Sequence, residues 1–115
     1  MRISVSGNGK KILFDLNDSS AALDLYNQLP LTINVKNFST NEKVFYPPES
    51  LNVKNTPMAN AKKGTLAYYA PWADVVMFYD HFGKGSGLYE LGEAVSGKEL
   101  IESLSGIIEI EKVEK

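Results

Sequence analysis

The sequence predicts a mainly-β domain, built as a closed or nearly closed β-barrel with two short helices covering its open ends. Most apolar residues recur with a period of two in short runs, as in strands with one buried face. Two runs with helical spacing stand at opposite ends of the chain. The last apolar run can return to pair with the first, and closure would remove exposed strand edges. An open α+β sheet is the alternative.

Bulk composition indicates one folded domain over residues 1–115. The chain is 43% hydrophobic and 23% charged, with a net charge of −2 and a single arginine, Arg2, which argues against a nucleic-acid partner. No apolar run approaches the roughly 18 residues that cross a bilayer, so we expect no membrane insertion. The absence of cysteine excludes disulfides and thiolate metal sites, and it fits a cytoplasmic location.

The chain opens with a predicted hairpin followed by a helix. Residues 2–6 and 11–16 alternate apolar and polar side chains, and residues 7–10 supply a turn able to take positive φ. Apolar side chains then recur at helical spacing over residues 22–29 until a proline stops them. We expect Asp18 to cap this helix, which should have about three turns.

The middle of the chain predicts four strands and one long loop. Residues 31–36 alternate as a half-buried strand, and residues 43–46 form a second short candidate. Prolines and asparagines break any period over residues 47–63, which predicts an irregular segment. Residues 66–70 and 75–79 are strands on either side of a Pro-Trp pair.

The C-terminal part predicts a strand, a helix and a closing strand. Residues 88–94 form the strand. Ser96 and Glu99 have the spacing of a capping box, so a second short helix should follow and end near Gly106. Residues 108–110 alternate with exposed glutamates and should pair with the first strand.

A family resemblance rests on residues 64–92, which hold seven of the twelve aromatic residues, the only tryptophan and the only histidine. The Tyr-Ala-Pro-Trp segment at 69–72, with Gly-Leu at 87–88 and Leu-Gly at 91–92, resembles the bacterial and archaeal cyclophilin-like domain family. The resemblance extends over nearly the whole chain. It implies a closed eight-stranded barrel capped by two short helices.

Cyclophilins themselves are peptidyl-prolyl isomerases and resemble the chain more distantly. Their catalysis depends on an arginine and a glutamine beside a hydrophobic pocket. The only arginine here is Arg2, in the first strand, and Val76 and Met77 stand where the glutamine would be. Because an apolar pocket without a donor stabilises a twisted amide poorly, the sequence favours a binding module, with a weak isomerase as the alternative.

The predicted site is an aromatic groove for a peptide or a small-molecule ligand. We expect Tyr68 and Phe78 to lie mainly in the core, and Tyr69, Trp72 and Phe82 to be exposed at the groove, since strand side chains alternate. The groove is expected to lack a charged group able to drive bond rotation. The predicted ligand-binding residues are Tyr46, Tyr69, Trp72, Phe78 and Phe82.

Other candidates have simpler interpretations. His81 stands beside Asp80 and near Asp74, but no second histidine completes a metal site, so a surface histidine is favoured. The glycine-rich run 83–87 leads into a strand and not into a helix, which favours a flexible turn over a phosphate site. No catalytic residue, metal or cofactor is predicted, although the planar groove leaves open a role beside a flavin enzyme. The oligomeric state is open.

Overall fold

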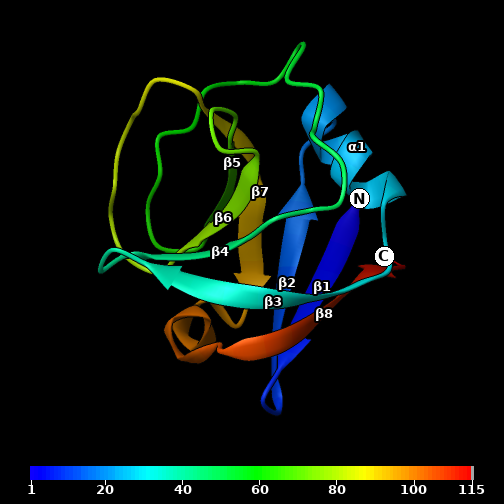
Figure 1. Ribbon diagram of the computed structural model, residues 1–115, viewed down its shortest axis with the longest axis vertical. Coiled ribbons are helices and arrows are strands. Elements are labelled where there is room, and N and C mark those ends of the chain that lie inside the picture. The colour runs from blue at the N-terminus through cyan, green and yellow to red at the C-terminus, as the bar shows by residue number, and fades with distance from the viewer. Residues whose placement is uncertain (115) are drawn as a thin grey trace.

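The computed structural model describes residues 1–114 as one closed barrel of eight antiparallel strands (Figure 1). The strands follow the order β1-β2-β7-β5-β6-β4-β3-β8, and β8 closes the barrel by pairing with β1. The predicted closed barrel and its terminal pairing are confirmed. The elements are β1 (Arg2–Gly7), β2 (Lys10–Leu16), α1 (Ser20–Asn27), β3 (Leu31–Phe38), β4 (Glu42–Phe45), β5 (Thr65–Tyr69), β6 (Asp74–Phe78), β7 (Leu88–Ser96), the 3₁₀ helix η1 (Lys98–Ser103) and β8 (Gly106–Val113).

The opening hairpin forms as predicted. Asn8 and Gly9 join β1 to β2 with φ values of 52° and 74°. Positive φ at both central residues matches the right-handed twist of the flanking strands, and Asn-Gly is the preferred pair for it.

Helix α1 begins one residue later than a cap at Asp18 would require. Ser19 is the N-cap, and its Oγ accepts a hydrogen bond from the Ala22 amide at 3.2 Å. An N-cap side chain accepts a hydrogen bond from the amide two or three residues after it, and Ala22 lies four residues after Asp18. The prediction of an Asp18 cap is therefore wrong, and the helix has eight residues, close to two turns.

The predicted capping box at Ser96 and Glu99 is also wrong. Ser96 is the last residue of β7 and lies opposite Leu13 of β2, so it belongs to the sheet and does not cap a helix. Gly97 follows with φ of 81°, and η1 starts after it without a side-chain cap. A Cβ at Gly97 would lie 2.5 Å from the Lys11 carbonyl oxygen, which explains the glycine.

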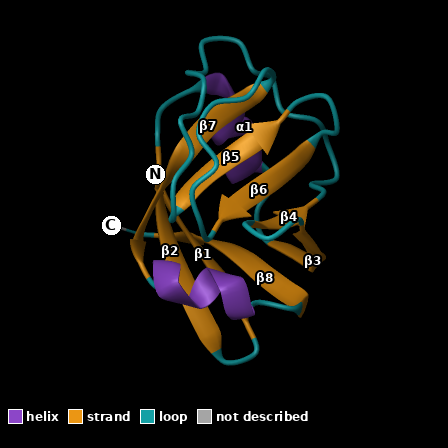
Figure 2. Cartoon of the chain, turned by 90° about the vertical axis from the view of Figure 1, so that its left-hand side faces the viewer, coloured by secondary structure: helices purple, strands orange, loops and turns teal. Residues whose placement is uncertain are grey.

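The barrel interior is filled by apolar side chains from all sides. Leu66 and Tyr68 of β5 meet Val75 and Met77 of β6 there, and both helices add residues to the same cluster. Figure 2 shows α1 and η1 toward opposite ends of the barrel, which agrees with their predicted capping role. Neither helix in the described chain is long and apolar enough to cross a membrane.

The boundaries of two strands, β3 and β4, differ from the prediction in a way that affects the site. β3 continues to Phe38, two residues past the predicted end, and β4 starts at Glu42 and ends at Phe45. The long loop between β4 and β5 is irregular, as predicted, apart from isolated bridges at Met58 and Ala61.

Candidate functional site

The outer face of β4, β5 and β6 carries a second apolar cluster, separate from the barrel interior. In β5, Leu66 and Tyr68 point into the barrel, while Ala67 between them joins the outer cluster. The long loop contributes through backbone hydrogen bonds, since the Ala59 amide donates to the Leu88 carbonyl at 2.9 Å. The cluster consists of Val44, Ala59, Ala61, Ala67, Val76, Phe78 and Leu88.

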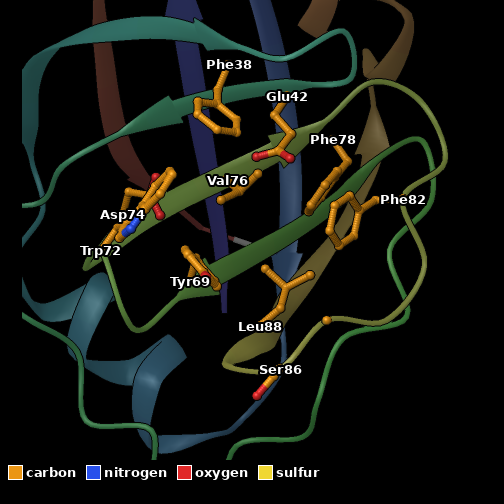
Figure 3. Close-up of a pocket in the computed structure, with 11 residues that line it drawn as sticks. Phe38, Glu42, Tyr69, Trp72, Asp74, Val76, Phe78, Phe82, Ser86 and Leu88 are labelled. Carbon is orange, nitrogen blue, oxygen red and sulfur yellow. The ribbon is translucent and has the colours of Figure 1, made fainter.

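A pocket of about 370 Å³ opens on this outer face (Figure 3). Its floor is built from β6, and β3, β4, β5 and residues 82–88 form the walls. The size is within the range of small-ligand sites. The lining residues are Phe38, Glu42, Tyr69, Trp72, Asp74, Val76, Phe78, Phe82, Gly85, Ser86 and Leu88.

Aromatic rings form two contacting groups in the pocket wall. Trp72 packs edge-on against Phe38 and Tyr69, with ring centroids 5.3 and 5.4 Å apart. Phe78 and Phe82 make the second group, 5.4 Å apart. Figure 3 shows Tyr69 and Trp72 toward one side of the pocket and Phe78 with Phe82 toward the other. These mutual contacts hold the rings in place.

Four of the five predicted groove residues line the pocket. Trp72 and Phe82 are 51% and 45% exposed, and Phe78 is buried at 1% while still contributing to the lining. Tyr46 does not line it. β4 ends at Phe45, so the chain leaves the sheet before Tyr46, whose half-exposed ring lies under Lys36, with Nζ 5.9 Å from the centroid.

Tyr68 lies in the barrel core, as expected from alternation. It is 2% exposed, and its hydroxyl accepts a hydrogen bond from the Leu51 amide at 3.1 Å. This bond ties the long loop to the barrel, because it satisfies a buried amide of the loop.

The glycine-rich loop forms part of the pocket rim and does not lead into a helix. Gly85 and Ser86 line the pocket. Gly87 has φ of 82°, and a Cβ there would lie 2.8 Å from Pro71 Cδ. The glycine therefore allows this loop to approach the turn that carries Trp72.

Two carboxylates in the pocket were missed by the sequence analysis. Glu42 is the first residue of β4 and Asp74 the first of β6, and they are 9% and 2% exposed. Asp74 Oδ1 has no hydrogen-bond partner. The expectation of a groove without a suitable charged group is thus wrong. Alternation could have indicated Asp74, because it shares a strand face with Val76 and Phe78.

Both carboxyl groups have raised pKa values. Burial raises the pKa of Asp74 from 3.8 to about 6, against a smaller lowering by its own backbone amide. Burial raises the pKa of Glu42 as well, with a further contribution from the charge of Asp74. At neutral pH Asp74 is mainly ionised, and none of the described lining residues is a lysine, an arginine or a histidine.

The remaining polar candidates lie elsewhere. His81 is exposed, its amide donates to the Asp80 carboxylate at 2.8 Å, and it does not line the pocket. Within residues 1–114 no three acidic or histidine side chains gather as a metal site. Arg2 Nε lies 2.6 Å from Asp15 Oδ1, on β1 and β2, and does not line the pocket either.

These features define a mainly-β protein with a closed eight-stranded barrel and an aromatic pocket, with two carboxylates, on its outer face. The chain belongs to the cyclophilin-like family, whose model matches residues 5–111. Among solved structures it is similar to the solution structure of the hypothetical protein AF2241 from Archaeoglobus fulgidus, with a TM-score of 0.72 and 15% identity over 98% of this chain and 95% of that one. This likeness shows the fold alone. No curated protein matches the chain.

Proposed function

We propose that the protein is a binding module whose outer pocket holds a small organic ligand without changing it chemically. The observation that carries the proposal is the pocket itself, a hollow of about 370 Å³ with aromatic walls and a few polar groups. Mostly apolar pockets of roughly 300–1,000 Å³ with a few placed polar groups are typical of ligand sites.

The order of the walls supports the same proposal. Trp72 contacts two other rings, and Phe78 of β6 is buried and contacts the Phe82 ring. Side chains that are already fixed lose little conformational entropy when a ligand binds. A preformed pocket therefore favours binding of a compact molecule over wrapping of a long peptide.

One observation favours a weak peptidyl-prolyl isomerase as the second candidate. Phe78, Phe82 and Leu88 provide an apolar wall on which a proline ring could pack. Against it stands the lack of a cationic donor in the described lining, since Arg2 is paired with Asp15 away from the pocket. Preorganised donors supply much of the electrostatic stabilisation in such reactions, so binding without isomerisation is the preferred function.

Nuclear magnetic resonance (NMR) mapping tests the proposal. A library of small organic fragments is added to the ¹⁵N-labelled protein, and we expect shifts confined to β6 and residues 82–88. Phe82→Ala should weaken the responding fragments, and Tyr46→Ala, a matched exposed aromatic outside the pocket, should not. A set of short peptides is added in a parallel series. Shifts with peptides and none with fragments would make a peptide the ligand of the pocket. The absence of pocket shifts in both series would contradict the proposed binding function.

A protease-coupled assay on a proline peptide separates the two candidate functions. The preferred function predicts the uncatalysed rate. A rate above background that Phe82→Ala abolishes would assign isomerase activity to this pocket.

The cytoplasmic location stays a prediction from the composition.

A further inference from the structure

We propose that the pocket selects organic cations, with an ammonium or guanidinium group beside Asp74 and Glu42 and an apolar body against Phe78 and Phe82. This inference rests on the proposed binding function and names the ligand class of the same pocket. Four features of the described residues support it: an unpartnered buried acceptor, uncompensated charge, nearby aromatic rings and a division into a polar and an apolar side.

The first feature is the unpartnered carboxylate oxygen of Asp74. Asp74 is 2% exposed, lines the pocket, and its Oδ1 accepts no hydrogen bond. Buried polar atoms in proteins are normally satisfied, so each exception needs an explanation. Among residues 1–114 the other buried side-chain oxygen without a partner is Asn41 Oδ1, and Asn41 does not line the pocket. The unpartnered oxygen is itself buried, and it belongs to a side chain that lines the pocket.

The second feature is negative charge without a counter-charge. The one salt bridge among the described residues joins Arg2 to Asp15, outside the pocket. On β4, Lys43 follows Glu42 directly but projects from the opposite strand face, with Nζ 5.9 Å from the Tyr79 ring. Two partly desolvated carboxylates are costly to keep unpaired, and a bound cation would compensate them.

The third feature is the set of rings around the carboxylates. Tyr69 lies opposite Asp74 in the β5–β6 ladder, and Trp72 precedes it by two residues and contacts both Tyr69 and Phe38. The face of an aromatic ring attracts a cation, most strongly for tryptophan. The carboxylates and the aromatic rings that line the same pocket therefore favour the same kind of ligand group.

The fourth feature is the division of the pocket. Phe78, Phe82 and Leu88 form a side without charge, and Figure 3 shows Asp74 on the opposite side of the view with the Glu42 carboxylate between. A metal ion would leave the apolar side unused, and a neutral apolar molecule would leave the carboxylates unpaired. An amine carried on an aromatic or aliphatic body satisfies both sides.

The test compares benzylamine, an ammonium at neutral pH, with benzyl alcohol, its neutral counterpart of similar shape. Binding is measured by calorimetry and by the emission of Trp72, the only tryptophan, which lines the pocket. At pH 7.5 we expect benzylamine to bind at least about tenfold more tightly, because only it pairs with a desolvated carboxylate.

Charge-removing variants locate the effect. Asp74→Asn should weaken the binding of benzylamine about tenfold and change the affinity for benzyl alcohol by less than about twofold. Glu42→Gln should act in the same direction. Glu99→Gln removes an exposed carboxylate from η1 and serves as the control for net charge. Unchanged benzylamine affinity in both pocket variants would overturn the inference.

A pH series on the unmodified protein gives a measurement that does not depend on the folding of any variant. The titratable groups facing Asp74 are Glu42 from β4 and Tyr69 from β5, and residues 82–88 add none to the lining. Protonation of Asp74, whose pKa burial raises to about 6, should weaken the binding of benzylamine several-fold between pH 7.5 and pH 5, while the binding of benzyl alcohol is unaffected. A benzylamine affinity independent of pH would contradict cation selection.

The outcomes separate this inference from the proposed function. Equal binding of amine and alcohol in the pocket would overturn cation selection and leave the binding module standing. Failure of both probes and of the fragment library would overturn both. A further titration with lysine that is acetylated on its α-amino group and amidated at its carboxyl group identifies the source of the cation. Tighter binding than that of benzylamine would assign the cation to a polypeptide side chain, and weaker binding would assign it to a free amine. Both results support the cation class.

Discussion

The inner and outer faces of β5 and β6 differ in how completely side chains fill the space above them. On the inner face Leu66, Tyr68, Val75 and Met77 are all buried, and the two helices close the barrel around them. On the outer face Ala67 and Val76 alternate with these residues, and a pocket opens above the strands. The same strand pair thus has a filled core on one face and a pocket on the other, because alternate side chains point to opposite faces.

Charge follows the same division. Glu42 and Asp74 stand on the outer face, where they line the pocket, whereas the inner faces of β5 and β6 present Leu66, Tyr68, Val75 and Met77. Buried carboxylates that lack a counter-charge destabilise a fold. Their position next to the pocket supports the proposal that the outer face serves recognition, while the inner face provides stability.

The largest expected effect is the loss of stability when a residue on the inner face is truncated. Leu66→Ala should lower the free energy of unfolding by about 2–5 kcal/mol, because it removes buried methyl groups and leaves a cavity. Phe82→Ala, on the half-exposed pocket rim, should cost clearly less, about 1 kcal/mol. Urea unfolding of both variants measures the difference. Equal losses would mean that the outer face is a second structural core.

A smaller effect is expected where the rim loop meets the turn before β6. Gly87→Ala should cost about 2–3 kcal/mol, because φ is 82° and the new Cβ would lie 2.8 Å from Pro71 Cδ. Gly9→Ala is the matched control, since its φ of 74° is similar and no atom lies within 4 Å of the added Cβ. It should cost about 1 kcal/mol. Equal losses in thermal unfolding would show that the loop has room to move away.

Removing the buried charge should stabilise the fold. The pKa of Asp74 is raised from 3.8 to about 6, so the folded state binds the proton more tightly than the unfolded chain. The stability associated with this proton is complete below pH 3.8 and is lost as pH rises through about 6. Asp74→Asn should therefore raise the free energy of unfolding by about 1–2 kcal/mol at pH 7.5, after allowing for screening by water in the open pocket.

The pH dependence of this gain is its control. At pH 3.5 both proteins are neutral at position 74, and the difference should vanish. Glu99→Gln, an exposed carboxylate, should change little at either pH. A stabilised Asp74→Asn protein that has also lost benzylamine binding would show that the charge is kept for recognition. An Asp74→Asn protein less stable than the parent at pH 7.5 would contradict the account.

The sequence predicted the barrel well because its signal is local. Alternation identified the opening hairpin and the terminal strand that pairs with it, and both are confirmed. The helix caps at Asp18 and Ser96 were mispredicted, because one residue of shift decides whether a side chain reaches an amide or stays in a sheet. Patterns of apolar residues do not resolve such shifts.

The pocket was predicted only in part. The aromatic run gave Tyr69, Trp72, Phe78 and Phe82, but not Phe38, which comes from a strand far away in the sequence. The place of Glu42 in the pocket lining could not be predicted from the sequence, since a single glutamate at the start of a strand has the pattern of a solvated residue. The long loop and the glycine-rich rim decide which part of the outer face is covered. Their positions follow from tertiary packing and not from local sequence patterns.

The most direct measurement is a ¹³C NMR titration of the Asp74 and Glu42 carboxyl carbons, with and without saturating benzylamine. We expect Asp74 in the free protein to titrate with a pKa of about 6 and Glu42 above its ordinary range, and benzylamine to move both pKa values downward. An Asp74 carboxyl that titrates near 3.8, or that benzylamine leaves unchanged while binding in the pocket, would contradict the claim that these carboxylates recognise a cation.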